Sequence, residues 1–511
     1  MMPEITIQST IVSFFALCIM GCMNFKSIVA SVSQKSVLIK IVFALYEQSP
    51  YFIWALVYYI SLAFVASNLG YLAVTVLFFS LKYVTSRDIR IASFIVAVAC
   101  LPFSKGKTID ILLIPQEKIL EFGFYDVGYY FPLYPSLFFF ALSFYTTVRS
   151  GSPIRLFLPS LYTSIGGLFL VWSSLPIFIS QFPLVIALSW VQLLSFGVIY
   201  ALPTLLNFSQ AVFRKLSHVF AAFVLFESIW VLLQVLNGGP VGVYIESVLP
   251  LNRLGILSTE DAGFMRFSGT FYEPSILGTY MLMHLWYFAI LFIKTKTHQT
   301  TDRWLYGVSM ICTVCSILCT GSRGIYGLTV VSFLFWAKQI FRNRLMTISV
   351  LVCTILLILL NPYLNSRIAS STTLFNQYGS GTFRLILNSY AVRLANVHIL
   401  GVGLNLSPYY FAVGFPKERM IDPSHPHNVL FQILAETGYI GLILAVVYLW
   451  TLFRKHMVIG RRSSSFPYMA AALSYLICAQ IYPIFISQQE IASYFFLFAG
   501  LMTAVTTYQH E

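Results

Sequence analysis

The amino-acid sequence predicts an all-α polytopic membrane protein with about fourteen transmembrane helices and one large external loop. Of its 511 residues, 58% are hydrophobic and only 10% are charged, whereas a soluble globular domain is about 45–50% apolar and about 25% charged. Apolar runs of about twenty residues, long enough to cross roughly 30 Å of hydrocarbon, recur along the whole chain. Basic residues fall in alternate loops between these runs. The bilayer is therefore the expected environment and first partner of the protein.

The predicted spans are the apolar runs at residues 8–24, 48–67, 70–84, 89–103, 127–147, 153–173, 182–203, 217–237, 268–293, 304–320, 324–341, 345–361, 428–453, 466–486 and 490–508. The helix count in residues 1–85 stays open, because segment 36–84 can hold two spans plus an interfacial helix. Only Glu4 precedes the first run, so a first membrane helix is favoured over a cleaved signal peptide.

Charge predicts the orientation of the chain. The formal net charge is +13, but the basic residues concentrate in short loops, as in 294–303 and 454–462, where the positive-inside rule places them. Nucleic acid is therefore not an expected partner. With the basic loops in the cytoplasm, the outer loops are 104–126, 174–181, 238–267, 321–324, 362–427 and 487–489.

The expected organisation has N-terminal transmembrane helices at 1–250, then transmembrane helices with the first arginine motifs at 251–361. An external loop subdomain at 362–427 and C-terminal transmembrane helices at 428–511 follow. The loop at 362–427 is the longest between two spans, and long loops in compact proteins are more often functional than idle.

Four polar features are predicted on the outer side. Arg266 and Glu273 flank the start of one span, and Arg323 lies in a tight Gly-Ser-Arg-Gly turn. Arg384 lies within the long loop. The segment Ser424-His-Pro-His-Asn428 opens a long apolar helix that carries Gln432 and Glu436.

These residue types suit phosphate chemistry. Arginine stays ionised and offers a planar fork of donors that matches phosphate oxygens, so Arg266, Arg323 and Arg384 are candidate diphosphate ligands without a metal ion. Histidine can accept a proton near neutral pH, which makes His427 the candidate catalytic base. His425, Asn428, Glu273 and Glu436 are supporting candidates. The cysteines lie inside apolar spans, and neither a metal nor a cofactor is expected.

Each feature also has a structural interpretation. An arginine at the end of a span often reaches toward lipid headgroups, and Arg384 can be a solvated loop residue. His427 at the start of a helix can be a capping or surface residue. Glu436 can be a protonated structural glutamate hydrogen-bonded to neighbouring helices. The choice between a functional and a structural role also stays open for Glu273.

The segment His425-Pro-His-Asn followed by Glu436-Thr-Gly-Tyr-Ile-Gly441 resembles the signature of the O-antigen ligase and O-antigen polymerase superfamily. The turn at 321–324 is similar to the first arginine motif of this superfamily. Phe383-Arg384, together with Gly401-Val-Gly403, resembles the loop helix of the superfamily that begins with an arginine. The resemblance covers about residues 260–445.

The resemblance implies a metal-independent glycosyltransferase of the membrane-embedded type C fold in the bacterial inner membrane, with its active site on the periplasmic side. It implies undecaprenyl-diphosphate-linked glycans as donor and acceptor, with His427 as base and Arg323 and Arg384 on the diphosphate. The sequence around Arg266 and Glu273 looks more like that of the polymerase branch than that of the ligase branch. A chain-length regulator would be a further partner of such a polymerase.

Three functions remain in view. The leading interpretation is a polymerase that joins lipid-linked repeat units. The nearest alternative is a ligase that transfers the finished polymer to lipid A core. A transporter of lipid-linked oligosaccharides is the third, because charged residues inside membranes also suit transport.

Overall fold

The computed structural model describes residues 50–63, 68–103, 109–112, 130–133, 135–150, 161–241, 266–271, 273–296, 299–340, 380–414, 425–459, 463–482 and 489–508. Its helices before the long loop are α3 (Pro50–Ala63), α4 (Asn68–Ser86), α5 (Ile89–Cys100), η1 (Leu101–Phe103), α7 (Pro135–Arg149), α8 (Leu161–Ser174), η3 (Leu175–Phe178), α9 (Pro183–Leu205), α10 (Gln210–Asn237), α12 (Pro274–Lys294), α13 (Thr300–Cys319) and α14 (Arg323–Ile340). The later helices are α17 (Ser380–Val397), α18 (Ser407–Gly414), α19 (Val429–Ile459), α20 (Phe466–Cys478) and α21 (Gln489–Tyr508).

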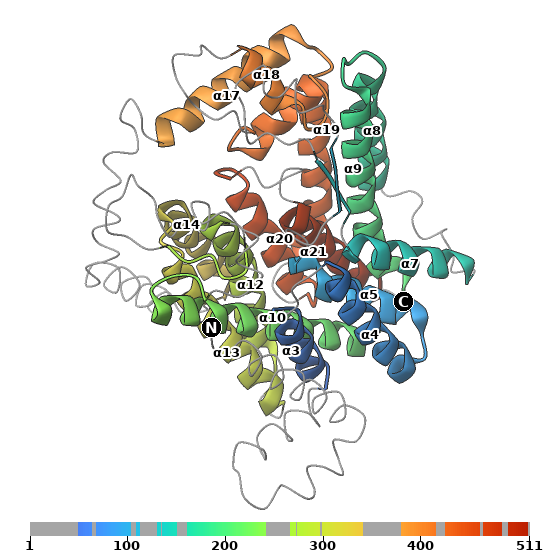
Figure 1. Ribbon diagram of the computed structural model, residues 1–511, viewed down its shortest axis with the longest axis vertical. Coiled ribbons are helices and arrows are strands. Elements are labelled where there is room, and N and C mark those ends of the chain that lie inside the picture. The colour runs from blue at the N-terminus through green and yellow to red at the C-terminus, as the bar shows by residue number, and fades with distance from the viewer. Residues whose placement is uncertain are drawn as a thin grey trace, which may run out of the picture.

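The described residues are almost entirely helical, as predicted (Figure 1), and each predicted span that they include contains a helix over part or all of its length. The spans at 8–24 and 345–361 lie outside them. In the described part, four helices are long and apolar enough to cross a membrane: Pro183–Leu205, Gln210–Asn237, Pro274–Lys294 and Val429–Arg454. Seven shorter apolar helices accompany them. The chain is thus a multi-pass helical membrane protein, and a total of about fourteen spans stays a prediction.

Local sequence explains where several helices begin and end. Pro183 and Pro274 occupy the first turn of α9 and α12, where the missing amide hydrogen of proline costs no helical hydrogen bond. The Asp88 side chain accepts from the Arg90 backbone N–H and caps α5. Gly238 ends α10 in the left-handed conformation, with φ of 62°, which glycine adopts without steric cost.

A short antiparallel strand pair is the exception to the helical architecture. Strands β1 (Ile109–Leu112) and β2 (Tyr130–Leu133) pair with Ile109 opposite Leu133. The predicted span at 127–147 therefore includes a strand, and its helix begins only at Pro135. Pro135 explains this start, because proline is accepted at the first helical position but clashes with a preceding helical turn.

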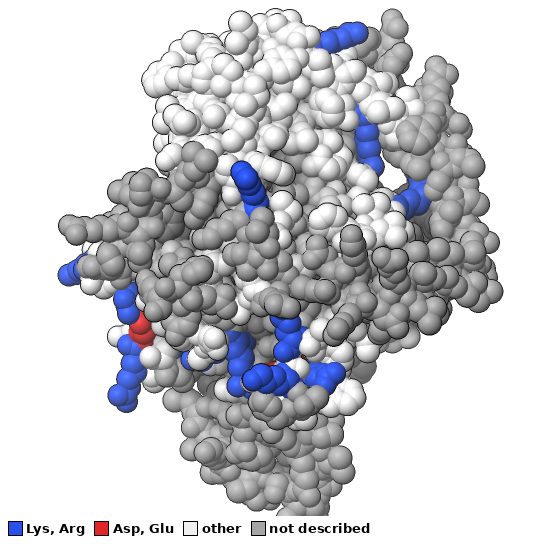
Figure 2. All heavy atoms as spheres, turned by 180° about the vertical axis from the view of Figure 1, so that it is seen from behind, with Lys and Arg blue, Asp and Glu red and all other residues white. Residues whose placement is uncertain are grey.

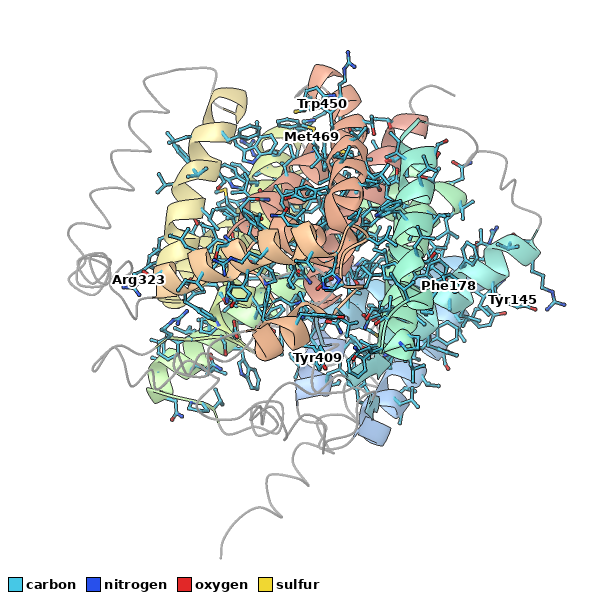
Figure 3. The ribbon with its side chains drawn as sticks, turned by 90° about the horizontal axis from the view of Figure 1, so that it is seen from above. Tyr145, Phe178, Arg323, Tyr409, Trp450 and Met469 are labelled. Atoms are coloured by element: carbon cyan, nitrogen blue, oxygen red, sulfur yellow. The ribbon has the colours of Figure 1, made fainter. Side chains whose placement is uncertain are left out.

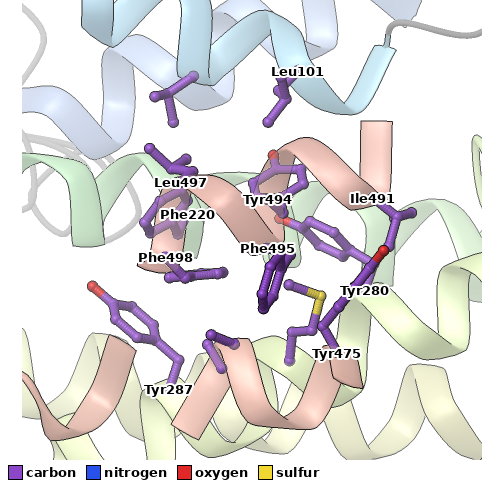
Figure 4. Packing of buried hydrophobic residues seen from close by; sticks show 14 of the residues in the cluster. Leu101, Phe220, Tyr280, Tyr287, Tyr475, Ile491, Tyr494, Phe495, Leu497 and Phe498 are labelled. Atoms are coloured by element: carbon purple, nitrogen blue, oxygen red, sulfur yellow. The ribbon is translucent and has the colours of Figure 1, made fainter. Parts of the chain in front are cut away.

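Helix α12 lies at the centre of the bundle, and every residue from 274 to 290 is buried. Aromatic side chains from α10, α12, α20 and α21 fill the space around it (Figure 4). The ring centroids of Tyr280 and Tyr494 are 5.1 Å apart, and those of Tyr287 and Phe498 are 5.4 Å apart. This dense aromatic core holds the ends of the central helices in fixed positions.

Large apolar side chains also lie on the outside of the bundle. Tyr145 and Trp450 are 59% and 58% exposed, and Figure 3 shows them at the periphery of the molecule. In water such surface would be costly, but a hydrocarbon environment solvates it. The exposed apolar belt agrees with a protein embedded in lipid.

Many of the Lys and Arg side chains gather in the lower half of Figure 2. In the first turn of α13, Asp302 forms an ion pair with Arg214, with Arg214 Nε 2.7 Å from Asp302 Oδ2, and His218 Nε2 lies 3.0 Å from Asp302 Oδ1. Helix α13 has 20 residues and is therefore about 30 Å long. The arginine turn at 321–324 follows the opposite end of this helix. The start of α13, next to the predicted cytoplasmic segment 294–303, and the arginine turn thus lie at opposite ends of this helix.

Candidate active site

The arginine turn is fixed by a tyrosine from a distant part of the sequence. The hydroxyl groups of Ser322 and Tyr482 lie 2.8 Å apart. A Cβ atom at Gly324 would overlap the Tyr482 hydroxyl, so only glycine lets the turn approach this closely. Gly321 has φ of 59°, a conformation that glycine adopts readily. Arg323, between the two contacts, is the first residue of α14, and Figure 3 labels it.

Arg266 lies against the same turn. Its Nε donates to the Thr320 carbonyl at 3.3 Å, and the Phe267 backbone N–H donates to the Cys319 carbonyl at 3.2 Å. The segment that carries Arg266 is thereby attached to the end of α13. Arg266 and Arg323 thus flank the same helix end.

Two polar residues of α10 hold the next part of this segment. The Glu227 carboxylate, 0% exposed, accepts from the backbone N–H and the hydroxyl of Thr270. About two helical turns further along the same face of α10, Gln234 accepts from the Gly269 N–H at 3.0 Å and donates to the Gly269 carbonyl at 2.9 Å. Glu227 and Gln234 therefore position the chain between Arg266 and α12.

Glu273 has a different environment. It is exposed, directly precedes α12 and accepts a hydrogen bond from Ser275 Oγ at 3.0 Å. Glu227 is therefore the buried carboxylate of this region, rather than Glu273.

Arg384 approaches the same tyrosine from the long loop. It lies near the start of α17, and its Cζ is 5.4 Å from the centroid of the Tyr482 ring, within the range of a cation–π interaction. The neighbouring residue, Phe383, makes an edge contact with the His427 ring at 6.2 Å between centroids. Arg384 and His427 thus lie beside each other, although 43 residues separate Arg384 from His427 in the sequence.

The electrostatic state of His427 follows from this placement. Burial lowers its pKa to about 3, and the charges of Arg384 and His425 act in the same direction. The imidazole is therefore neutral at neutral pH. Its Nδ1 is buried without a hydrogen-bond partner among the described residues. A neutral imidazole beside a guanidinium is able to accept a proton.

His425 is held by a buried polar cluster. Its Nδ1 lies 3.2 Å from Glu436 Oε1, and also 3.2 Å from Ser407 Oγ and 3.2 Å from Gln432 Nε2. The Ser407 hydroxyl donates to Glu436 Oε1 at 2.8 Å. Gln432 and Glu436 are four residues apart and therefore share one helix face. The cluster anchors the histidine segment to α18 and α19.

Asn428 caps α19 and fastens it to the end of α20. Its Oδ1 accepts from the Leu430 N–H at 2.9 Å, and its Nδ2 donates to the Gln480 carbonyl at 3.1 Å. The Val429 N–H donates to the Ala479 carbonyl at 2.8 Å. The turn that ends in Tyr482 therefore also supports the histidine segment.

Helix α19 is kinked just beyond Glu436. Gly438 has φ of 70° and ψ of −174°, so helical hydrogen bonding is interrupted there. The freed carbonyls of Ala435 and Glu436 accept from the N–H groups of Val402 and Gly403 at 2.9 and 3.0 Å, and Trp172 Nε1 donates to the Thr437 carbonyl at 2.8 Å. The Gly-Val-Gly segment of the loop is thereby bonded to the kink.

Tyr482 contacts both the arginine turn and Arg384, the charge of Arg384 acts on His427, and Arg266 lies on the adjoining helix end. Tyr482, Ser407 and Glu227 were not predicted from the sequence. Glu227 carried a usable signal, because an ionisable residue inside an apolar span is a functional candidate by default. Tyr482 carried none, since tyrosine occurs 31 times in the chain.

Comparison with known families bears on this same region. Residues 308–446 match the family model described as O-Antigen ligase. No curated protein matches the chain. The matched region contains Arg323, Arg384, His427 and Glu436 and excludes Arg266 and Tyr482. The chain therefore carries an O-antigen ligase family domain, which supports its predicted place in the O-antigen ligase and polymerase superfamily.

Proposed function

We propose that the protein is a polysaccharide polymerase of the bacterial inner membrane. It transfers an undecaprenyl-diphosphate-linked glycan onto a sugar hydroxyl of a second lipid-linked repeat unit. The site faces the periplasm, because the arginine turn follows the end of α13 that is opposite to the basic segment 294–303, which the positive-inside rule places in the cytoplasm. The family domain at 308–446 supports glycosyl transfer in general.

One observation carries the chemistry: the Arg384 guanidinium lies beside a neutral, buried imidazole whose Nδ1 has no partner among the described residues. Buried polar atoms normally have hydrogen-bond partners, so a ligand hydroxyl is a fitting partner for this one. A cation and a proton acceptor in the same site are the two groups that displacement of a diphosphate requires.

The proposed reaction is a single displacement. The acceptor hydroxyl oxygen bonds to the anomeric carbon of the donor, and the bond from that carbon to the diphosphate oxygen breaks. The lipid diphosphate leaves with the electron pair, and His427 takes the hydroxyl proton. Arg266, Arg323 and Arg384 stabilise the charge on the leaving group. His425, Glu436 and Asn428 hold His427 in place, and Glu273 lies at the edge of the site.

Incubation of the purified full-length protein with a defined lipid-linked repeat unit tests this function. A ladder of products that increases by one repeat unit is the expected result. Turnover in EDTA should equal turnover without it, because the arginines take the place of a metal ion. Loss of turnover in EDTA with recovery on adding a divalent metal would contradict that part of the proposal.

The family description favours a second candidate, a ligase that moves the polymer to lipid A core. The two functions share the donor and differ in the acceptor. Offering both acceptors in one reaction separates them. Transfer of labelled glycan to lipid A core, with no lengthening of the lipid-linked repeat unit, would identify the protein as a ligase rather than a polymerase.

Arg323→Lys is expected to lower turnover strongly, although it keeps the positive charge. An ammonium is a compact point charge and cannot make the two parallel hydrogen bonds of a guanidinium to phosphate. The initial rate with the lipid-linked repeat unit measures the effect, and Arg393→Lys, an exposed change on α17, is a matched control. A wild-type rate in the Arg323 variant would argue against a role in diphosphate binding.

A further inference from the structure

We propose that Tyr482 is a positioning residue for the diphosphate-binding arginines. Its hydroxyl holds the turn that carries Arg323, and the face of its ring holds the Arg384 guanidinium. The inference rests on the proposed function and adds to it a residue that lies outside the matched family region.

The hydroxyl contact is specific. Tyr482 is 6% exposed, and its Oη lies 2.8 Å from Ser322 Oγ. Burial raises the pKa of the phenol, so the group stays protonated and able to donate. The absence of a side chain at Gly324 leaves room for this hydroxyl. The contact therefore fixes the turn on both sides of Arg323.

The ring contact is separate from the hydroxyl contact. Arg384 Cζ lies 5.4 Å from the ring centroid, and guanidinium groups are attracted to the negative face of aromatic rings.

The backbone around Tyr482 explains why this residue can act as a reference point. Tyr482 follows α20, and its N–H donates to the Cys478 carbonyl at 3.1 Å. The same turn binds Asn428 and Val429 at the start of α19. One rigid turn thus contacts the three segments that supply Arg323, Arg384 and His427. An aromatic ring, with only two side-chain torsions, is well suited to hold them at fixed separations.

Binding of undecaprenyl diphosphate to the full-length protein in lipid nanodiscs tests the proposal, because this probe lacks the glycan and reports on the arginines alone. Tyr482→Phe and Ser322→Ala should each weaken binding about 2- to 10-fold, the range for one lost hydrogen bond. The double variant should be no weaker than either single variant, because both changes remove the same bond. Tyr482→Leu should weaken binding about 2- to 30-fold further than Tyr482→Phe, because the cation–π contact is lost as well.

Tyr475→Phe is the matched control. Tyr475 is a buried tyrosine within α20, and its ring stacks on Phe495, with the ring centroids 4.9 Å apart. Its variant should bind the probe like the wild type. Thermal unfolding of every variant in the same nanodiscs separates a local effect from general destabilisation.

The outcomes are distinct. If the wild type does not bind undecaprenyl diphosphate, the proposed function fails. If the wild type binds it and Tyr482→Phe and Tyr482→Leu bind equally well, the positioning role fails while the function stands. Additive losses in the double variant would also contradict the proposal, because the two hydroxyls would then act independently.

Discussion

His427→Gln is expected to reduce turnover of the lipid-linked repeat unit by about 10²- to 10⁴-fold, the usual contribution of a general base. Glutamine has a similar size and polarity but cannot take the hydroxyl proton. Binding of the donor should change little, because the arginines that hold the diphosphate remain. Initial rates under saturating donor, together with donor binding in nanodiscs, measure the two quantities separately.

His398→Gln is the appropriate control for this experiment. His398 lies in the same long loop, just after α17, and its ring packs against Tyr410 at 5.4 Å between centroids. The variant should turn over like the wild type. A wild-type rate in the His427→Gln variant would contradict the role of His427 as the base. A transporter would also be expected to tolerate this change.

Arg384→Gln should have the second large effect. Loss of a charged group that stabilises developing charge typically costs about 10²- to 10³-fold in turnover. The same change should raise the pKa of His427, because the charge of Arg384 contributes to the lowering of that pKa to about 3. Burial is the larger cause, so the pKa should rise only part of the way toward the ordinary value of about 6.5.

NMR titration of histidine-labelled protein in nanodiscs measures this shift, with the His427 signal assigned from the His427→Gln variant. In the donor-free wild type the imidazole should stay neutral throughout the mildly acidic range and protonate near pH 3. Saturation with undecaprenyl diphosphate should shift the pKa in the same direction as Arg384→Gln, because the negative diphosphate offsets the guanidinium charge. An unchanged His427 titration in both cases would show that Arg384 and His427 do not interact.

Donor binding would thus prepare the base. A neutral imidazole with a pKa of about 3 accepts a proton only weakly, and catalysis improves as the pKa of the base approaches the working pH. The donor diphosphate, which is the leaving group, also raises the proton affinity of His427, and His427 activates the acceptor hydroxyl. Turnover therefore requires the donor to be in place before the acceptor hydroxyl is deprotonated.

The charged part of the site could be predicted from the sequence, and its uncharged part could not. Arg323, Arg384 and His427 stand out because charge is rare in a chain with 10% charged residues. Tyr482 joins them through a hydroxyl and a ring face, and such contacts leave no local pattern. Ser407 could not be predicted for the same reason, since serine side chains usually bond to nearby backbone groups.

Hydropathy predicted the positions of the helices but not their irregularities. The run at 428–453 reads as one straight span, whereas Gly438 breaks it. Gly441, three residues later, is helical and packs near Trp172. The sequence alone does not distinguish a glycine that permits a positive φ from one that permits close packing. The partners of the kink come from Val402 and Trp172, which are distant in the sequence.

The bonds at this kink provide a reporter of motion. Any movement that lifts the loop away from α19 must break the hydrogen bonds from Val402 and Gly403 to Ala435 and Glu436. Their amide hydrogens should therefore exchange with deuterium only when the loop detaches, so mass spectrometry of peptides spanning 398–406 would time that event. Faster exchange during turnover would identify loop release as part of the catalytic cycle, and unchanged exchange would mean that glycans enter and leave while the loop stays docked.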